Sequence, residues 1–355
     1  MTAKKARKKI ANVCIDDVAK RAGVSITTVS RVINKNPCVK VYNKDKVDHA
    51  IAELGFRPNM SARRLAGGKI NTIGLILPRF EDMFHTYYVT EVIRGVCDTA
   101  SNSGLDVLIH LTAKDLKPQS LGTHLDNVSL CSGVIFADIQ GNEDLLREVI
   151  GTQTPCVVMN HLDYKLAAAC VSIDNKGGSI KAVDHIVSLG HKRIACITGD
   201  LGIQAGKERL EGYKESLKRH GIEIDKALIK RCDFSPQRAR KAAVDLLGID
   251  EHPTAIFAAS DEMAVETVRA LREKKLKVPQ DISVIGFDDS WFATQGPIGI
   301  TTVRQPLALM AEKSVAVLLD MIQSKGKASL ARIVLPTELV IRETCVSPLK
   351  QEDFY

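Results

Sequence analysis

Apolar residues in the first seventy positions recur every three or four residues, which is the period of short amphipathic helices. They fall on one face of residues 15–22, and Gly23 follows at a point where a helix can end in a left-handed cap. Ser25 is a good N-cap for a second helix, which runs from Ile26 to about Asn34. The pattern predicts a helix-turn-helix, an arrangement whose second helix enters the major groove of DNA.

Two further helices are predicted before residue 70. Apolar residues share one face of the segment Lys44–Leu54, which would close a small core. Pro58 then ends the helical pattern, and the following SARRLAGG can form one or two helical turns. A helix this short is not stable alone in water, so we expect it to fold when it packs against DNA.

From Ile70 onward the pattern changes to short apolar runs separated by amphipathic helices. Such runs, rich in β-branched residues, are typical of buried parallel strands in α/β layers. The clearest runs are 72–78, 105–111, 133–138, 155–160, 192–199, 254–260 and 282–288. They fall into two groups divided near residues 161–175, which predicts two α/β lobes. A ligand is expected between such lobes, near the carboxyl ends of the strands.

Charge is distributed unevenly along the chain. The 355 residues have a net charge of +7, but residues 1–70 carry 16 Lys and Arg against 5 Asp and Glu, a net +11. The remaining residues therefore have a net charge of −4. This asymmetry indicates a polyanion-binding module joined to a neutral or acidic domain, with a basic solubilising tail as the alternative.

Cysteine usage and missing motifs narrow the class of protein. The nine cysteines form no CxxC pair and have no histidine at zinc-ligand spacing, which suits a reducing compartment. No apolar run is long enough for a secretory signal or a membrane span, so we expect a cytoplasmic protein with no membrane partner. Nucleotide-cradling glycine motifs and the GxSxG elbow are absent. The sequence predicts no catalytic residue, no cofactor and no metal.

Several motifs carry a resemblance to a known family. IDDVAKRAGVSITTVSRVIN, followed by ELGFRPNMSARRLAGG, is similar in order and spacing to the N-terminal signature of the LacI/GalR repressors. VDHIVSLGHKRIACITG, RLEGYKESL and TTVRQP resemble the sensor domain of that family. The resemblance implies an α-helical helix-turn-helix head plus an α/β two-lobed periplasmic-binding-protein-like sensor domain. The expected boundaries are a basic arm at 1–14, the head at 15–57, a hinge helix at 58–69, the effector-binding and dimerisation domain at 70–345, and a tail at 346–355.

The resemblance also implies which residues contact DNA. The family reads base edges from the first positions of the second helix, here Ile26 and Thr27, with Arg31 one turn further on. Contacts that would mainly be to phosphates are implied for Ser25, Thr28 and Asn34. The hinge helix would enter the minor groove with Leu65 as an apolar wedge, beside Asn59, Arg63 and Ala66.

Some of these assignments have alternatives. Ile26 could be an ordinary helix residue, and Leu65 could pack on the sensor domain. The family usually has a threonine just before the first helix, where it caps that helix and meets a phosphate. Cys14 stands there in this sequence, so Asp16 or Asp17 would have to take over the capping.

Cleft residues are implied in the same way. Arg209, Asp261 and Asp288 match cleft positions of the family, and an arginine fork with two carboxylates can hydrogen-bond hydroxyls or an amine. The opposite wall differs, because RFEDMFHTYYVTEVIRG stands where a shorter Asn-Pro-aromatic segment is usual. Phe84 or Tyr88 could stack on a sugar face, or either could belong to the core. For Trp291, near the cleft mouth, effector contact and packing both stay open.

Together these observations lead to the hypothesis of a sequence-specific transcription regulator, by resemblance a repressor. A homodimer would bind a pseudo-palindromic double-stranded operator, and a small-molecule effector between the lobes would control its affinity. The family's commonest effector is a sugar or sugar derivative. The C-terminal residues lack the heptad leucines of tetrameric relatives, which favours a dimer. A solute-binding protein with a vestigial head is the first alternative, and an enzyme on a two-lobed α/β fold is the second.

Overall fold

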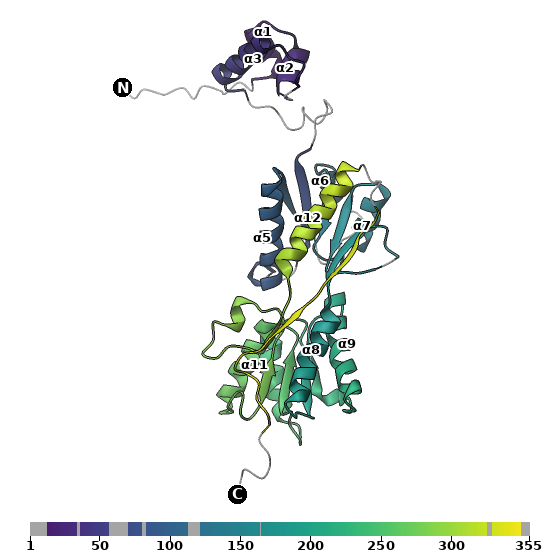
Figure 1. Cartoon of the computed structure of the whole chain (residues 1–355), viewed down its shortest axis with the longest axis vertical. Coiled ribbons are helices and arrows are strands. Elements are labelled where there is room, and N and C mark those ends of the chain that lie inside the picture. Colours follow the sequence, from purple (N-terminus) through teal and green to yellow (C-terminus); the bar gives the residue numbers. More distant parts are fainter. Residues whose placement is uncertain are drawn as a thin grey trace, which may run out of the picture. The chain divides into compact units, whose positions relative to one another are not determined.

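The computed structural model divides the chain into two compact units, Met1–Ile70 and Asn71–Tyr355 (Figure 1). The structure describes residues 13–33, 36–56, 70–79, 83–112, 121–163, 165–324 and 329–348. In these ranges, no helix has both the length and the apolar character needed to cross a membrane.

The first unit is a three-helix head made of α1 (Ile15–Ala22), α2 (Ile26–Ile33) and α3 (Val41–Leu54). Its core is small, with Val18, Val29 and Val47 fully buried, one from each helix. Gly23 ends α1 in the left-handed region (φ 66°), and the main-chain N–H of Thr28 donates to Ser25 Oγ at 3.2 Å. The predicted turn and both of its caps are confirmed.

The second unit begins with a lobe that we call the N-lobe. Its six-stranded parallel sheet has the order β11-β5-β4-β3-β1-β2. The strands are β1 (Thr72–Pro78), β2 (Asp106–Thr112), β3 (Val134–Phe136), β4 (Cys156–Met159), β5 (Ala169–Ile173) and β11 (Arg332–Leu335). One face is covered by α5 (Tyr87–Asn102) and α12 (Leu307–Gln323), and the other by α6 (Leu121–Val128) and α7 (Glu143–Gly151).

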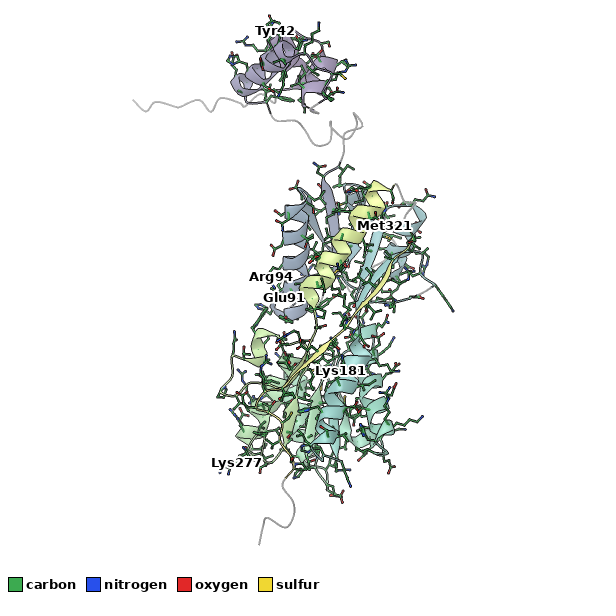
Figure 2. All side chains as sticks on the ribbon, viewed as in Figure 1. Tyr42, Glu91, Arg94, Lys181, Lys277 and Met321 are labelled. Atoms are coloured by element: carbon green, nitrogen blue, oxygen red, sulfur yellow. The ribbon has the colours of Figure 1, made fainter. Side chains whose placement is uncertain are left out.

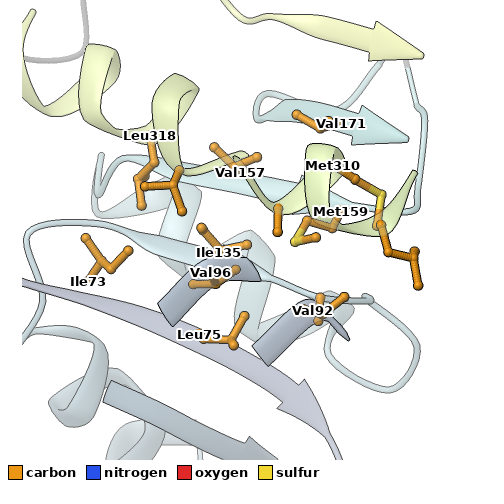
Figure 3. Close-up of a cluster of buried hydrophobic side chains, with 14 of the residues drawn as sticks. Ile73, Leu75, Val92, Val96, Ile135, Val157, Met159, Val171, Met310 and Leu318 are labelled. Carbon is orange, nitrogen blue, oxygen red and sulfur yellow. The ribbon is translucent and has the colours of Figure 1, made fainter. Parts of the chain in front are cut away.

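Alternation along the strands determines which helices cover each face. Ile73 and Leu75 of β1 point toward Val92 of α5 and Leu318 of α12 (Figure 3), whereas Ile76 packs with the helices on the opposite face. Because both faces of the sheet are covered, residues that point to either face find apolar partners, and the strands read as continuous apolar runs.

The other lobe, the C-lobe, has a four-stranded parallel sheet in the order β7-β6-β8-β9. Its strands are β6 (Ile194–Thr198), β7 (Ile229–Arg231), β8 (Ala255–Ala258) and β9 (Ser283–Ile285). α8 (Asn175–Ser188) and α9 (Gln204–Arg219) cover one face, and α10 (Pro236–Leu247) and α11 (Asp261–Glu273) the other. Short elements complete the unit: η1 (Met83–His85), η3 (Lys226–Leu228), η4 (Trp291–Ala293) and an antiparallel pair of β10 (Thr302–Arg304) with β12 (Glu338–Val340).

The predicted grouping of strands into two lobes, divided near residues 161–175, is confirmed, but two further passages between the lobes were not predicted. β5 joins the N-lobe sheet, and α12 and β11 return to it after the C-lobe has been built. The chain therefore passes between the lobes three times, after β5, after β10 and after β11. Near the last passage, Lys181 of α8 donates through Nζ to the carbonyl oxygen of Thr337 at 2.6 Å (Figure 2).

Candidate functional site

Arg209 lies at the centre of a buried polar network in the second unit. Its Nε donates to Asn175 Oδ1 at 2.9 Å, and Nη2 donates to Gln305 Oε1 at 3.3 Å. Nη1 donates to the carbonyl oxygen of Ala259 at 2.7 Å and to Asp288 Oδ1 at 3.1 Å. These acceptors come from α8, from the ends of β8 and β9, and from the passage after β10, so one side chain joins four segments at the carboxyl ends of the strands.

Aromatic rings enclose the guanidinium. It lies 3.8 Å from the ring centroid of Phe287 and 5.6 Å from that of Phe234, within the range of cation–π attraction. Burial raises the pKa of Asp288, and the charge of Arg209 opposes that rise. Gln305 Nε2 donates to Asp288 Oδ1 at 2.6 Å, whereas Oδ2 accepts no hydrogen bond from the described part of the chain. The Asp288 carboxyl group is thus held in place through Oδ1, with its second oxygen still available to a ligand.

The network continues into the N-lobe. Asn175 Nδ2 donates to Oδ1 of Asn160, the residue that follows β4, at 3.3 Å. Tyr88 of α5 donates its hydroxyl to a main-chain carbonyl after β3 at 2.5 Å. Burial and the Asp138 carboxylate raise the pKa of Tyr88, while Asn160 and Arg209 oppose the rise, so these side chains lie close to one another. Residues from both lobes therefore meet around one buried arginine.

Direct contacts also join the lobes at two edges of this network. At one edge, Glu262 of α11 accepts a hydrogen bond from the main-chain N–H of Tyr87, the first residue of α5, at 3.1 Å. The ring of Tyr87 packs edge-to-face on Trp291, with centroids 5.1 Å apart. At the other edge, Gln140 Nε2 donates to Asp200 Oδ2 at 3.4 Å and the main-chain N–H of Leu162 donates to Gln204 Oε1 at 2.9 Å. The lobes are in contact on both sides of Arg209.

The structure separates the six effector residues expected from the sequence. Arg209, Asp288 and Tyr88 lie in the network, and Trp291 lies at its edge against Tyr87. Phe84, in η1, is 58% exposed, and no contact of its side chain joins it to the network in the described part of the chain. The aromatic residues that the structure places at the edge of the network are therefore Tyr87 and Trp291 rather than Phe84.

Asp261 lies behind the network. It is completely buried, and its Oδ2 accepts from the main-chain N–H and the hydroxyl of Ser290 at 2.7 and 3.1 Å. Oδ1 accepts from the hydroxyl of Thr302 at 2.5 Å. Burial raises the pKa of Asp261 to about 7, although these hydrogen bonds oppose the rise. With both oxygens engaged inside the C-lobe, the geometry favours a positioning role over the direct effector contact expected from the sequence.

The head presents the start of α2 on its surface. Ile26 is 47% exposed, and Thr27 and Arg31 are also exposed, as residues that read DNA must be. Ser25 Oγ lies 2.9 Å from Thr28 Oγ1, so these hydroxyls support each other at the N-terminus of α2. The other expected DNA contacts, Asn34, Asn59, Arg63, Leu65 and Ala66, lie outside the described residues.

The N-terminus of α1 shows what replaces the threonine cap. The main-chain N–H of Cys14 donates to Asp17 Oδ2 at 2.9 Å, and its thiol donates to the same oxygen at 3.1 Å. These bonds hold the pKa of the Asp17 carboxyl below its usual value. Of the two residues that could have taken over the capping, the structure selects Asp17, and this engages the Cys14 thiol.

Comparison with known proteins finds matches for both units. Residues 14–59 match the model of the bacterial regulatory proteins of the lacI family, and residues 183–345 match a periplasmic binding protein-like domain. The transcriptional regulator DegA of Bacillus subtilis is 35% identical over 338 residues, covering 94% of this chain and 98% of its own length. The transcriptional repressor CytR of Escherichia coli is 32% identical over 95% of this chain and 98% of its own length.

The chain belongs to the LacI family.

Solved structures agree with this assignment. The lac repressor dimer bound to operator and the anti-inducer ONPF has a TM-score of 0.83, at 29% identity over 95% of this chain and all of that one. A complex of the regulator CelR with cellobiose has a TM-score of 0.71, at 30% identity over 94% of this chain and all of that one. This LacI-family chain is a DNA-binding transcription regulator with an effector-binding domain. Its full-length relatives are regulators, so a solute-binding protein or an enzyme is not favoured.

Sequence reasoning on this LacI-family chain missed several residues of the network: Tyr87, Asn160, Asn175, Phe234, Glu262 and Gln305. Asn160, Asn175 and Gln305 follow the strands β4, β5 and β10, respectively. Polar side chains are expected to converge at such strand ends. That signal was available for Asn160, which is the last residue of the predicted run 155–160. Phe234 and Glu262 gave no signal, because only the folded chain brings them to Arg209 and Tyr87.

Asp138, after β3, makes the stability of the LacI-family chain depend on pH. Burial raises the pKa of Asp138 to about 6, although the main-chain N–H of Gln140 donates to it at 3.0 Å. Because the folded state favours the protonated carboxyl, the contribution of Asp138 to stability is fully present below pH 3.8 and falls as the pH rises to about 6. We expect Asp138→Asn to remove this fall, as measured by urea unfolding at a series of pH values. The exposed Asp126→Asn is the control, and an unchanged slope in Asp138→Asn would contradict the assignment.

Proposed function

We propose that this protein is a cytoplasmic homodimeric repressor of a palindromic operator. Its affinity for the operator rises or falls when a neutral, polyhydroxylated effector binds around Arg209. The proposal rests on the polar network around Arg209. This network joins Tyr88 and Asn160 of the N-lobe to Asn175, Arg209 and Asp288 of the C-lobe. A ligand inserted there changes the contacts between the lobes, and the head would sense that change. For the domain boundaries we keep residues 15–57 for the head, 58–69 for the hinge helix and 70–345 for the sensor.

The balance of donors and acceptors supports a neutral, hydroxyl-rich effector. Arg209 is the cation of the network and already donates to four acceptors of its own chain. Asp288 Oδ2 is available as an acceptor, and Asp138 and Glu262 add further carboxylates nearby. A phosphate or carboxylate would meet like charges there, whereas sugar hydroxyls would donate to these oxygens. Cellobiose in the CelR complex and ONPG in a lac repressor complex fit that chemistry.

Exposed residues at the start of α2 support sequence reading by the head. Arg31 can bind guanine O6 and N7 with two hydrogen bonds, and Ile26 can contact a thymine methyl group. Leu65 in the hinge helix would kink the operator centre as an apolar wedge. The lac repressor structure shows a dimer on its operator, which is the arrangement proposed here. Two-fold protein symmetry then requires a pseudo-palindrome.

Selection of random duplex DNA by the purified full chain tests this function. At about 0.15 M salt, counterion release suppresses non-specific binding, so enrichment reports sequence reading. We expect a palindrome whose central step is easily unstacked, as a leucine wedge requires. Recovery of unrelated sequences at the same salt would contradict the proposed function.

Cys14 offers a substitution expected to improve DNA binding. Threonine at this position would keep a cap for α1 and add a hydroxyl that can donate to a phosphate. One such hydrogen bond contributes about 1 kcal/mol, so Cys14→Thr should tighten the binding of each head to its half of the selected palindrome about fivefold. The exposed Cys38→Ser is the control for loss of a thiol. Equal affinity of wild type and Cys14→Thr would show that this end of α1 meets no phosphate.

A further inference from the structure

The turn that carries Asp288 has an unusual backbone. Asp288 has φ 123° and Asp289 has φ 54°, and both are non-glycine residues in the left-handed half of conformational space. Such conformations persist only where surrounding contacts enforce them. One such contact is the hydrogen bond from the main-chain N–H of Asp288 to the carbonyl oxygen of Val303, at 2.7 Å. Further contacts must hold the turn on its other side.

Asp289 provides these contacts through two arginines. Its Oδ2 accepts from Arg304 Nε at 2.6 Å, and its Oδ1 accepts from Arg342 Nη2 at 2.5 Å. The Asp289 side chain is only 9% exposed, so solvent screens these pairs poorly. Arg342 also donates through Nη1 to the carbonyl oxygen of Ile300 at 2.9 Å, which fixes the direction of its guanidinium.

The next residue of the turn is fixed as well. Ser290 donates its main-chain N–H and hydroxyl to Asp261, which is itself held by Thr302. Two neighbouring carboxylates therefore face opposite ways: that of Asp288 meets Arg209 in the effector site, and that of Asp289 meets Arg304 and Arg342 behind it. η4, which carries Trp291, begins directly after this turn.

The arginines connect the turn to segments that pass between the lobes. Arg304 is the last residue of β10, just before the passage to α12, and Gln305 within that passage donates to Asp288. Arg304 also pairs with Glu338, the first residue of β12 after the passage from β11, at 3.1 Å. A shift of the turn would therefore displace residues in or next to two of the three passages between the lobes.

We propose that Asp289 is a positioning residue. By bridging Arg304 and Arg342, it orients the Asp288 carboxyl group toward the effector and the Trp291 ring toward Tyr87 of the N-lobe. It also connects Asp288 and Trp291 to the passages between the lobes. The part that concerns effector binding rests on the proposed function.

The single tryptophan of the sequence gives a test that needs no ligand. Asp289→Asn keeps the size of the side chain and removes the charge that holds both arginines. We expect a red shift of Trp291 emission and stronger acrylamide quenching, because the indole loses its fixed place against Tyr87. Glu338→Gln is the matched control, since it removes a pair of Arg304 that is largely exposed and does not touch the turn. Arg342→Lys is the second variant, with an intermediate shift expected, in case Asp289→Asn folds poorly.

Binding measurements separate positioning from a general loss of stability. For a neutral sugar that alters DNA binding of the wild type, Asp289→Asn should weaken sugar binding about tenfold, as loss of an ordered charge-assisted contact does. Affinity for the selected palindrome without sugar should stay at the wild-type value, and Asp289→Glu should restore part of the sugar affinity. Wild-type emission and quenching in Asp289→Asn would overturn the inference. If no sugar acts on the wild type, the proposed effector class fails, while the fluorescence result still decides the role of Asp289.

Discussion

Replacement of Arg209 by methionine is expected to abolish the response to effector and to lower the stability of the sensor domain by about 3–5 kcal/mol, the usual effect of removing one partner of a buried ion pair. The side chains of Arg209 and Asp288 are 4% and 12% exposed, so little solvent could replace the guanidinium. Asn175, Gln305 and the carbonyl of Ala259 would lose their donor in the same step. Urea unfolding followed by Trp291 fluorescence measures the loss.

Arg219→Met is the matched control for this variant. Arg219 lies on the same helix, α9, and pairs with Glu215 on the exposed surface. Exposed pairs of this kind contribute about 0–1 kcal/mol, so this variant should keep both stability and effector response. Equal losses in the two variants would show that Arg209 is not the centre of the site.

Val47→Asp is expected to unfold the head and to eliminate DNA binding. Val47 of α3 is fully buried against α1 and α2, and an unpaired carboxylate placed there would be strongly destabilising. A core as small as that of the head cannot absorb a loss of several kcal/mol. Hydrogen exchange of the full chain should show loss of protection in residues 13–56 and unchanged protection from residue 71 onward.

Tyr42→Asp on the same helix serves as the control, because Tyr42 is 67% exposed. Its head should keep wild-type exchange protection. A protected head in Val47→Asp would contradict the three-helix core described here, and a loss of protection in the sensor as well would contradict the independence of the two units.

Local signals in the sequence were sufficient for much of the head. Gly23 and Ser25 mark the turn because a left-handed residue and an N-cap each favour particular residue types, and the structure has both. The start of α3 shows the limit of such signals. This helix begins at Val41, three residues before the predicted start. Its true start could not be read from the residue types, because the N-cap residue is Lys40, whose side chain makes no capping hydrogen bond.

The sensor domain shows a different limit. Continuous apolar runs predicted most of the buried strands of both lobes, since burial on two faces leaves a strong pattern, but the buried strand β5 was not among them. β11 is an edge strand whose apolar run, Ile333–Leu335, is short and partly exposed, and its return to the N-lobe depends on packing between segments far apart in the sequence. The resemblance to the family implied an effector contact for Asp261, and only the folded chain shows that Ser290 and Thr302 already donate hydrogen bonds to both of its oxygens.

A small molecule bound around Arg209 is proposed to control DNA binding by the head. The most direct measurement is the affinity of the full chain for its selected palindrome, with and without each member of a panel of neutral sugars, at about 0.15 M salt. We expect at least one sugar to change that affinity by about 5- to 150-fold, the usual range of coupling between two sites, and to have no effect on Arg209→Met. An affinity that no sugar changes, or a change that persists in Arg209→Met, would contradict control of DNA binding through Arg209.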